Sequence, residues 1–419
     1  MVTANLATAS LKATGASASR TFGARFADCV SVKDFGATGD NSTNDGPALQ
    51  AALTFLRKTS SPSSRALYIP PGNYITNQVL NITNTEGVRI FGDGSVATVI
   101  KYRGSATAGN SEGSTANALA ITPVIMTNGF SYSSLSGIHL NSIPGANTVG
   151  IYFYQDNTHS KGNTDQLNIS DLLVDGPCAT GYLIGYEATA LVSEIMFHNC
   201  VVNGATAYGF RNVSTNALNN NLYNCGGVGN AVWASCPTGS MNVYGASLAQ
   251  NTLDIQAGQM PMAVVGCRTE SLAFVDAGSA GQTYVTIIGC GQIPGNSTNP
   301  ASFVNVQNSQ AMLIGNYIGS NIATQGKILG SAYVSMIGNY FGNTAPFSGF
   351  TGEVRHYDNP QFAGTVATLP AASAPFKGVR LFVKDATAAA STSNFSSTVT
   401  GGGANTVPVW CDGAAWRIG

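Results

Sequence analysis

The sequence predicts an all-β solenoid, a parallel β-helix, from three observations. A short pattern of apolar residues followed by Gly or Asn recurs at intervals of 21 to 26 residues between positions 195 and 339. Val, Ile, Tyr, Phe and Thr alternate with polar residues in short runs, and no run has the residue types and spacing of a helical repeat. A second strand-like run follows each repeat. Two or three strands per period, wound in one sense, form the coils of a parallel β-helix.

Each repeat can be aligned on its Gly or Asn residue. The aligned residues are Asn199, Asn224, Gly245, Gly266, Gly289, Gly315 and Gly338. In four repeats the next residue is a cysteine: Cys200, Cys225, Cys267 and Cys290. Stacked coils lie about 4.8 Å apart, so we expect one buried column of reduced cysteines. A functional thiol or a disulfide is the alternative.

Charged residues are scarce, which excludes several classes of protein. Asp, Glu, Lys and Arg make up 9% of the 419 residues, and the net charge is -1. A nucleic-acid binder needs clustered Lys and Arg to neutralise phosphates, so we expect no nucleic-acid partner. No window reaches about 18 consecutive apolar residues, and the N-terminus lacks the apolar core of a secretory signal, so we expect no membrane insertion. The cysteines form no zinc-ligand cluster, and we expect no metal and no other cofactor.

A helix is expected at residues 46–58, before the coils. A Gly-Pro pair opens it, and Leu49, Leu53 and Leu56 follow at helical spacing. An uncovered end coil would present unpaired strand backbone and an apolar cross-section, so the helix is expected to cap the solenoid. The coils before residue 165 carry longer loops, which is where binding groups usually lie.

Both ends of the chain resemble one known family. VSVKDFGATGDNSTNDGPALQAAL (30–53) and LYIPPGNYIT (67–76) are similar to the entry segment of pectate-lyase-like right-handed β-helix proteins, in the form found in bacteriophage tailspikes and capsule depolymerases. ARFADCVSVKDFGA (24–37) resembles a tailspike neck. The segment from Thr365 onward, with Trp410 and Trp416, resembles a C-terminal module of phage tail proteins. The coils between these ends resemble the family only in their period.

The resemblance implies a right-handed parallel β-helix that assembles as a homotrimer and binds, and often cleaves, bacterial surface polysaccharide. It predicts a neck at residues 1–28 that attaches to phage tail or baseplate proteins. A β-helix domain at 29–355 and a small β-rich assembly or binding module at 356–419 would follow. Such a protein belongs to the virion tail, is made in the host cytoplasm and acts at the host cell surface.

The entry motif is specific for the fold, since its Asp and Gly residues close turns and cap helices. It therefore does not mark an active site. The sequence does not contain the polygalacturonase-type motifs NTD, DD, GHG and RIK in order. Gly137-Ile138-His139 is not a GHG motif. Calcium-dependent pectate lyases need a carboxylate cluster with a basic residue, and Lys and Arg are scarce along the coils. Neither the polygalacturonase-type nor the calcium-dependent lyase active site is expected.

The first candidate catalytic pair is Asp156 and Glu187. Glycoside hydrolysis needs two carboxyl groups, one protonated and one ionised, and aligning VGIYFYQD with TGYLIGYE places these two on successive coils. Tyr154 and Tyr186 beside them would bind sugar rings, and His159 in the next polar loop is a further binding candidate. Alternatively, both acids end strands at solvated turns, and the histidine is merely exposed.

The second candidate site combines Trp233, Asp254 and Asp276. Aligning the second strands places the tryptophan above Asp254, with Asp276 one coil further on. Alternation with Leu253 and Ile255 turns Asp254 outward, so an exposed Trp above a catalytic acid would bind a saccharide. A trimer interface or an ordinary surface column is the alternative.

The leading hypothesis is a trimeric phage tailspike that hydrolyses a bacterial surface polysaccharide with a carboxylate pair. A receptor-binding spike of the same fold without chemistry is the first alternative. A polysaccharide lyase is the second, and it would use Tyr or Lys as base and stabilise developing charge with Arg, Asn or a cation.

Overall fold

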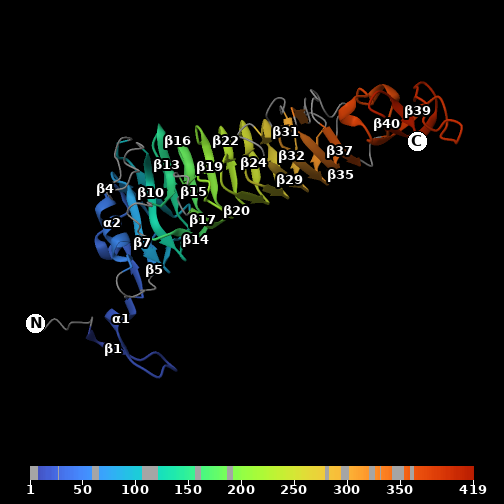
Figure 1. Ribbon diagram of the computed structural model, residues 1–419. Helices are drawn as coiled ribbons and strands as arrows, with labels where there is room; N and C mark the ends of the chain where they lie inside the picture. The colour runs from blue at the N-terminus through green and yellow to red at the C-terminus, as the bar shows by residue number, and fades with distance from the viewer. Residues whose placement is uncertain are drawn as a thin grey trace, which may run out of the picture. The chain divides into compact units, whose positions relative to one another are not determined.

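A computed structural model of the protein is drawn in Figure 1. The structure describes residues 8–26, 28–58, 66–105, 121–155, 162–185, 192–278, 283–293, 302–319, 326–330, 332–341, 353–358 and 363–419. The chain divides into two compact units, residues 1–206 and 207–419. Parallel strands wound into coils dominate both units, which confirms the predicted right-handed parallel β-helix. In these ranges no helix is long and apolar enough to cross a membrane.

The first described residues form a small sheet of their own. β1 (Ser10–Leu11) pairs antiparallel with β2 (Arg20–Thr21), and α1 (Phe22–Phe26) follows directly. The guanidinium of Arg20 donates to both carboxylate oxygens of Asp28, at 2.7 and 2.9 Å, and so links β2 to the start of the coils. This sheet lies in the segment predicted to attach to the phage tail, a role that stays a prediction.

The predicted cap helix is α2 (Gly46–Phe55), which ends three residues earlier than expected. Leu49, Ala52 and Leu53 are buried, and the helix packs against β7 (Leu80–Glu86) and the 3-10 helix η2 (Val32–Phe35). After the helix, Lys58 is hydrogen-bonded to Asn84 of β7. The Lys58 N–H donates to the Asn84 carbonyl at 2.7 Å, and Asn84 Nδ2 donates back to the Lys58 carbonyl at 3.1 Å.

Unit 1 contains three series of parallel strands. The first is β3 (Cys29–Ser31), β5 (Ala66–Ile69), β8 (Arg89–Gly92), β11 (Ser134–Ser136), β14 (Thr164–Ser170) and β17 (Val192–His198). The second is β4 (Asp40–Asn44), β6 (Gly72–Thr76), β9 (Thr98–Tyr102), β12 (His139–Asn141), β15 (Leu173–Asp175) and β18 (Val201–Asn203). The third is β7, β10 (Thr122–Ser131), β13 (Gly145–Tyr154) and β16 (Cys178–Ile184).

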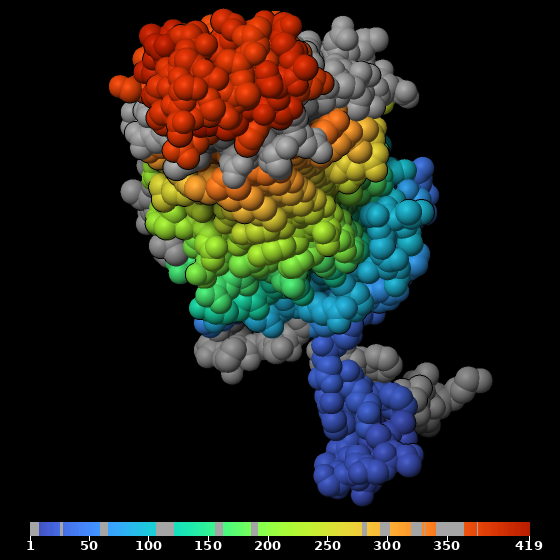
Figure 2. All heavy atoms as spheres, turned by 90° about the vertical axis from the view of Figure 1, so that its right-hand side faces the viewer, coloured from blue at the N-terminus to red at the C-terminus, as the bar shows by residue number. Residues whose placement is uncertain are grey.

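Unit 2 repeats the same three series, and Figure 2 shows its yellow-to-orange coils as parallel bands. The first is β20 (Asn220–Tyr223), β23 (Met241–Tyr244), β26 (Met262–Val265), β29 (Tyr284–Ile288), β32 (Gln310–Ile314), β35 (Tyr333–Ile337) and β37 (Glu353–Asp358). The second is β21 (Gly226–Val228), β24 (Ser247–Ala249), β27 (Arg268–Glu270), β30 (Gly291–Gln292), β33 (Tyr317–Ile318) and β36 (Tyr340–Phe341). The third is β19 (Tyr208–Asn212), β22 (Val232–Cys236), β25 (Leu253–Ala257), β28 (Ala273–Ala277), β31 (Ser302–Gln307) and β34 (Gly326–Leu329).

The Gly or Asn on which the sequence repeats align is the turn between the first and second series. In unit 2 these residues have φ between 52° and 67°, at Asn224, Gly245, Gly266, Gly289, Gly315 and Gly338. Glycine adopts this left-handed conformation freely and Asn tolerates it better than most residues, because its short side chain bonds locally. The repeated Gly or Asn in the sequence therefore reports one left-handed turn per coil.

The cysteines that follow these turns are buried and free, as expected. In unit 2, backbone bonds between successive coils place Cys225, Ala246, Cys267, Cys290 and Asn316 in one column. The Cys290 thiol accepts the Cys267 N–H at 3.4 Å, and the Cys290 N–H donates to the Asn316 side chain at 2.8 Å. Cys200 follows a turn of the same conformation in unit 1 and is also buried.

Residues 363–419 form a small β module with a core of its own. The antiparallel strands β39 (Arg380–Ala386), β40 (Asn405–Cys411) and β41 (Trp416–Ile418) are joined at one edge by the short parallel β38 (Ala363–Gly364). Trp416 is buried, and its indole N–H donates to the Pro370 carbonyl at 2.7 Å. Trp416 thus anchors the module, as its position in the sequence suggested.

Candidate active site

Two acids of unit 1 lie on alternate coils with one residue between them. Glu86 ends β7, and Asp165 lies near the start of β14. Ser131, at the end of β10, pairs with Glu86 on one neighbouring strand and with Asp165 on the other. Neighbouring strands lie about 4.8 Å apart. The backbones of the two acids are therefore separated by two strand spacings, about 9.6 Å.

A hollow of about 410 Å³ opens at this place. Its lining is mainly polar and comprises Lys58, Asn84, Thr85, Glu86, Gly129, Ser131 and Gly162. The lining residues come from the chain after α2, from the ends of β7 and β10, and from the segment before β14. Four separate segments of the chain thus supply one cavity, whose volume lies in the range of about 300 to 1,000 Å³ that is usual for ligand sites.

Glu86 forms an ion pair with the ammonium group of Lys58. The lysine is positioned by two hydrogen bonds with Asn84, one between the two backbones and one from the Asn84 side chain. A carboxylate that lines a polar cavity can take a proton from a bound water. Glu86 is therefore the candidate base.

Asp165 has the opposite environment, because it is only 8% exposed. Burial raises the pKa of its carboxyl, a hydrogen bond from Asn163 opposes this, and the charges of Glu194 and Glu86 raise the pKa further. Asn163 Nδ2 donates to one carboxyl oxygen at 3.1 Å, while the other oxygen has no partner among the described residues. A buried oxygen without a donor favours the protonated form, so Asp165 has the environment of an acid.

An exposed aromatic ring lies beside the pair. Tyr132 follows Ser131, is 59% exposed and donates its backbone N–H to the Asp165 carbonyl at 3.2 Å. Its φ is 49°, which is unusual for a bulky residue. A ring held in this way can stack on the apolar face of a sugar. Within the described ranges, no three His, Cys, Asp or Glu side chains gather closely enough to hold a metal ion.

Sequence inspection missed this site because long insertions hide the repeat there. From Glu86 to Ser131 is 45 residues and from Ser131 to Asp165 is 34, against 21 to 26 in the regular coils. The feature that marks the site is a backbone conformation that recurs at each of its three residues. Each of the three residues precedes one with positive φ, namely Gly87 (67°), Tyr132 (49°) and Gln166 (52°).

The first predicted pair lies outside the described residues, as do Tyr186 and His159. The register of β13 with β16 matches the alignment that paired Asp156 with Glu187, since Ile151 pairs with Tyr182 and Phe153 with Ile184. The pair itself stays a prediction.

The described residues on either side of residues 156–161 are hydrogen-bonded to each other and to Asp165. Gln155 Nε2 donates to Asn163 Oδ1 at 3.3 Å, and Asn163 in turn donates to Asp165. The chain on either side of residues 156–161 is thus bonded together next to the acid.

The prediction that Tyr154 binds substrate is wrong. Its side chain is fully buried in the core of the coils, with its ring centroid 5.3 Å from that of Tyr152. The prediction rested on the place of Tyr154 beside Asp156 in the sequence, which does not determine whether its side chain is exposed. The last seven residues of β13 are all buried, so this strand has no exposed face on which a tyrosine could meet a sugar.

The prediction of a surface site at Trp233, Asp254 and Asp276 is also wrong. Trp233 is fully buried, and its indole N–H donates at 2.9 Å to the carbonyl of Gly226 on β21. Asp254 is equally buried, and the hydroxyl of Thr269 on β27 donates to it. Both side chains fill the corner between two series of strands, where consecutive residues turn inward and alternation fails.

Asp276 does not extend that column, because it pairs with Gln256 rather than with Asp254. It is half-buried on β28. Asp254 instead has Asn251 as a second donor, at 2.9 Å, and burial raises the pKa of Asp254 to about 7 although these hydrogen bonds oppose the shift. An acid enclosed inside the solenoid cannot reach a polysaccharide, so Asp254 is a core residue.

Stacked coils of parallel strands, with a turn residue of positive φ between the first and second series, define a right-handed parallel β-helix protein. The chain belongs to the rhamnogalacturonase A/epimerase, pectate lyase-like family, because the model of that family matches residues 29–248, more than half of the chain. No curated protein sequence matches it.

Two solved phage proteins share the fold. The N-terminal fragment of gene product 12 of bacteriophage phi29 is 14% identical with a TM-score of 0.51, over 78% of this chain and 65% of that one. The enzymatically active domain of tailspike protein 2 of bacteriophage CBA120 is 14% identical with a TM-score of 0.55, over 74% of this chain and 47% of that one. The chain thus spans less than two thirds of either structure, and at this identity the likeness concerns the fold.

Proposed function

We propose that the protein is a phage tailspike that binds a bacterial surface polysaccharide and hydrolyses it. The observation that carries the proposal is the contrast between Asp165, a buried carboxyl with a raised pKa, and Glu86, a carboxylate that lines the polar cavity and is paired with Lys58. Both acids pair with Ser131 on the strand between them. Two carboxyl groups whose environments differ in this way are what glycoside hydrolysis requires. The fold shared with a tailspike whose described domain is enzymatically active supports the same proposal.

The two acids have separate roles in the proposed reaction. Protonated Asp165 gives its proton to the glycosidic oxygen as the bond from that oxygen to the anomeric carbon breaks. Glu86 takes a proton from the water that attacks the same carbon, so one sugar leaves with a new hydroxyl and the other gains the water oxygen. A spacing of two strands, about 9.6 Å between backbones, suits the wider carboxyl separation of about 6.5 to 9.5 Å in inverting enzymes.

Asp156 and Glu187 remain the second candidate pair, supported by the register of their strands. Adjacent coils about 4.8 Å apart would favour the shorter separation of retaining enzymes, about 5 to 5.5 Å. The stereochemistry of the product therefore distinguishes the two pairs.

The homotrimer is likewise a proposal. Unit 2 exposes an apolar strip in which the rings of Tyr317 and Tyr340 stack at 5.0 Å and Ile337 lies exposed nearby in sequence. Burying such a strip between copies of the chain would stabilise the assembly. Residues 356–419 are proposed to contribute to assembly or binding, and residues 1–28 to attach the spike to the phage tail in the virion.

One assay tests the function. The protein is incubated with purified host capsule or O-antigen, and chain length, new reducing ends and ultraviolet absorbance are followed. Hydrolysis gives reducing ends without a gain in absorbance. A gain in absorbance would show an unsaturated sugar and hence a lyase, and retained binding without either change would show a spike that only attaches.

A further inference from the structure

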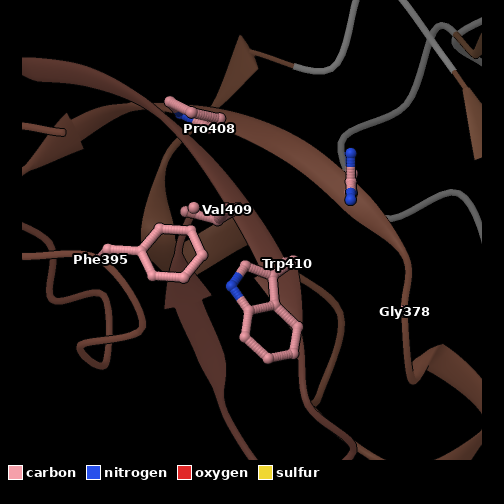
Figure 3. Close-up of a pocket in the computed structure, with 7 residues that line it drawn as sticks. Gly378, Phe395, Pro408, Val409 and Trp410 are labelled. Carbon is pink, nitrogen blue, oxygen red and sulfur yellow. The ribbon is translucent and has the colours of Figure 1, made fainter. Parts of the chain in front are cut away.

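The C-terminal β module has a second hollow, unconnected with the acidic cavity described above. It measures about 460 Å³ and is lined by Gly378, Arg380, Phe395, Pro408, Val409 and Trp410, with Gly419 at its edge. Figure 3 shows Trp410 and Phe395 on the same side of the sheet, with the indole nitrogen on the side that faces Phe395. The lining combines two aromatic rings with one cation.

The sheet register builds one side of this pocket. β39 and β40 pair so that Arg380 lies opposite Trp410, and both side chains are on the face away from the module's core. The next residues, Leu381 and Val409, point into the core and are buried. The cation and the indole are thus fixed next to each other by backbone hydrogen bonds.

The loop before β40 holds the second ring in place. Ser396 has a φ of 62°, and its N–H donates to the Ile418 carbonyl of β41 at 2.7 Å. The side chain of Asn394 donates to the Ala389 carbonyl at 2.9 Å, which closes the loop on itself. Phe395, between these two anchored residues, is 63% exposed. An apolar ring is therefore held at the surface although it would be more stable buried.

Two polar groups of the pocket lack partners. The indole nitrogen of Trp410 is shielded from solvent and bonded to no described residue. A buried N–H without an acceptor costs about 1 to 3 kcal/mol, so native proteins seldom leave one. The exposed guanidinium of Arg380 likewise has no ion-pair partner in the described part of the chain, whereas Arg417 on the same sheet is bonded to Asp412 at 2.6 Å.

We propose that this pocket binds an acidic sugar, a pyranose that carries a carboxylate. The C–H face of such a ring would stack on Trp410 and Phe395. The carboxylate would accept from Arg380, whose planar guanidinium suits that geometry. The volume lies within the range of about 300 to 1,000 Å³ that is usual for small-molecule sites. The site would retain an acidic polysaccharide independently of any cleavage in unit 1.

Titration calorimetry on the full-length protein tests this proposal, with D-glucuronate and D-galacturonate as probes and D-glucose and D-galactose as uncharged counterparts. We expect the uronates to bind at least 10-fold more tightly than the neutral sugars. Trp410→Ala should abolish binding, and Phe395→Ala should weaken it 5-fold or more. Arg380→Gln should remove the preference for the charged sugar while weak binding of both remains.

The same strand offers matched controls. Phe382 is an aromatic side chain that is 54% exposed but does not line the pocket, and Lys384 is an exposed cation two residues further on. Phe382→Ala and Lys384→Gln should leave uronate binding unchanged. Thermal melting establishes that each variant is folded.

Three results would overturn the proposal. The first is that neither uronate binds to the wild-type protein at tens of millimolar. The second is that folded Trp410→Ala binds uronate as well as the wild-type protein does. In the third, uronates and neutral sugars bind equally while Trp410→Ala changes the oligomeric state in light scattering, which would identify the pocket as an interface between chains.

Discussion

Glu86 and Asp165 lie on either side of one residue, since both pair with Ser131 across neighbouring strands. The spacing of the coils sets their separation, and the surroundings of their side chains differ. Lys58 neutralises Glu86, while Asp165 is buried beside like charges. The same backbone periodicity that builds the solenoid thus places the two acids on either side of Ser131, which lines the cavity together with Glu86.

Replacing either acid should stop cleavage without unfolding the protein. We expect Asp165→Asn and Glu86→Gln each to lower turnover of the host polysaccharide by 100-fold or more, about 2.7 kcal/mol of barrier at about 1.36 kcal/mol per factor of ten. Release of reducing ends measures this. Glu270→Gln, which breaks a surface ion pair with Arg268 in unit 2, is the matched control and should retain activity.

Product stereochemistry separates the two candidate pairs. NMR of the first-formed anomer should show inversion if Glu86 and Asp165 act, because they lie two coils apart. Retention, together with full activity of Asp165→Asn and loss of activity in Asp156→Asn and Glu187→Gln, would contradict our assignment. It would support the adjacent-coil pair instead.

The pH profile should respond to Glu194, whose charge helps to raise the pKa of Asp165. A general acid must be protonated to act, so kcat/KM falls as the pH rises through its pKa. Glu194→Gln removes a like charge and lowers the pKa of Asp165, so the alkaline limb should move to lower pH. Asp175→Asn, outside the cavity, should leave this limb in place, and an unchanged profile in Glu194→Gln would count against Asp165 as the acid.

Protein stability should decrease as the pH rises from about 4 to about 7 because of Asp254. Burial raises the pKa of its carboxyl to about 7 in the folded chain, against about 4 in an unfolded one. Between these values the folded state binds one more proton than the unfolded state, so unfolding becomes easier as the pH rises and no further change follows above about 7. The loss is on the order of 4 kcal/mol at about 1.36 kcal/mol per pKa unit.

Urea midpoints at pH 5 and pH 8 measure this loss. Asp254→Asn should reduce the difference between the two midpoints, because the amide does not titrate. Asp276→Asn, on the next strand but half-buried, should keep the wild-type difference. Equal differences in the wild-type protein and Asp254→Asn would show that the buried carboxyl does not titrate in this range.

Thiol labelling tests the reduced cysteine column. Of the eight free cysteines only Cys29 is exposed, and burial raises the pKa of Cys178 and Cys236 to about 12. A thiolate-specific reagent should therefore label one thiol per chain in the native protein and all eight in denaturant. Fewer than eight labelled thiols in denaturant, without reductant, would reveal a disulfide.

Light scattering tests the proposed trimer. We expect three times the chain mass of 43.1 kDa, and a smaller assembly for Tyr317→Ser combined with Ile337→Ser, because the exposed apolar strip would lose its affinity for a second copy. Deleting residues 356–419 should also weaken the assembly. A mass of one chain for the wild-type protein would contradict the trimer, and an unchanged state after the deletion would contradict the role of the module.

The sequence by itself determined the coil architecture of this protein. A left-handed turn accepts few residue types, so Gly or Asn must recur once per coil, and the turns at Asn224 and Gly245 are visible as a period in the sequence. The cap helix and the buried cysteines were predictable for the same reason. Each follows from a local preference of the backbone or from the need to bury an apolar side chain.

Only the tertiary structure decided which acids are exposed to solvent and which lie close to one another. Asp254 and Trp233 alternate with apolar neighbours like surface residues, yet both fill a corner between two series of strands, and the strand that carries Tyr154 is buried on both faces. Glu86 and Asp165 come together although 78 residues separate them, because their strands both keep register with Ser131. Burial and register depend on what packs around a strand, and a strand's own residues do not encode that.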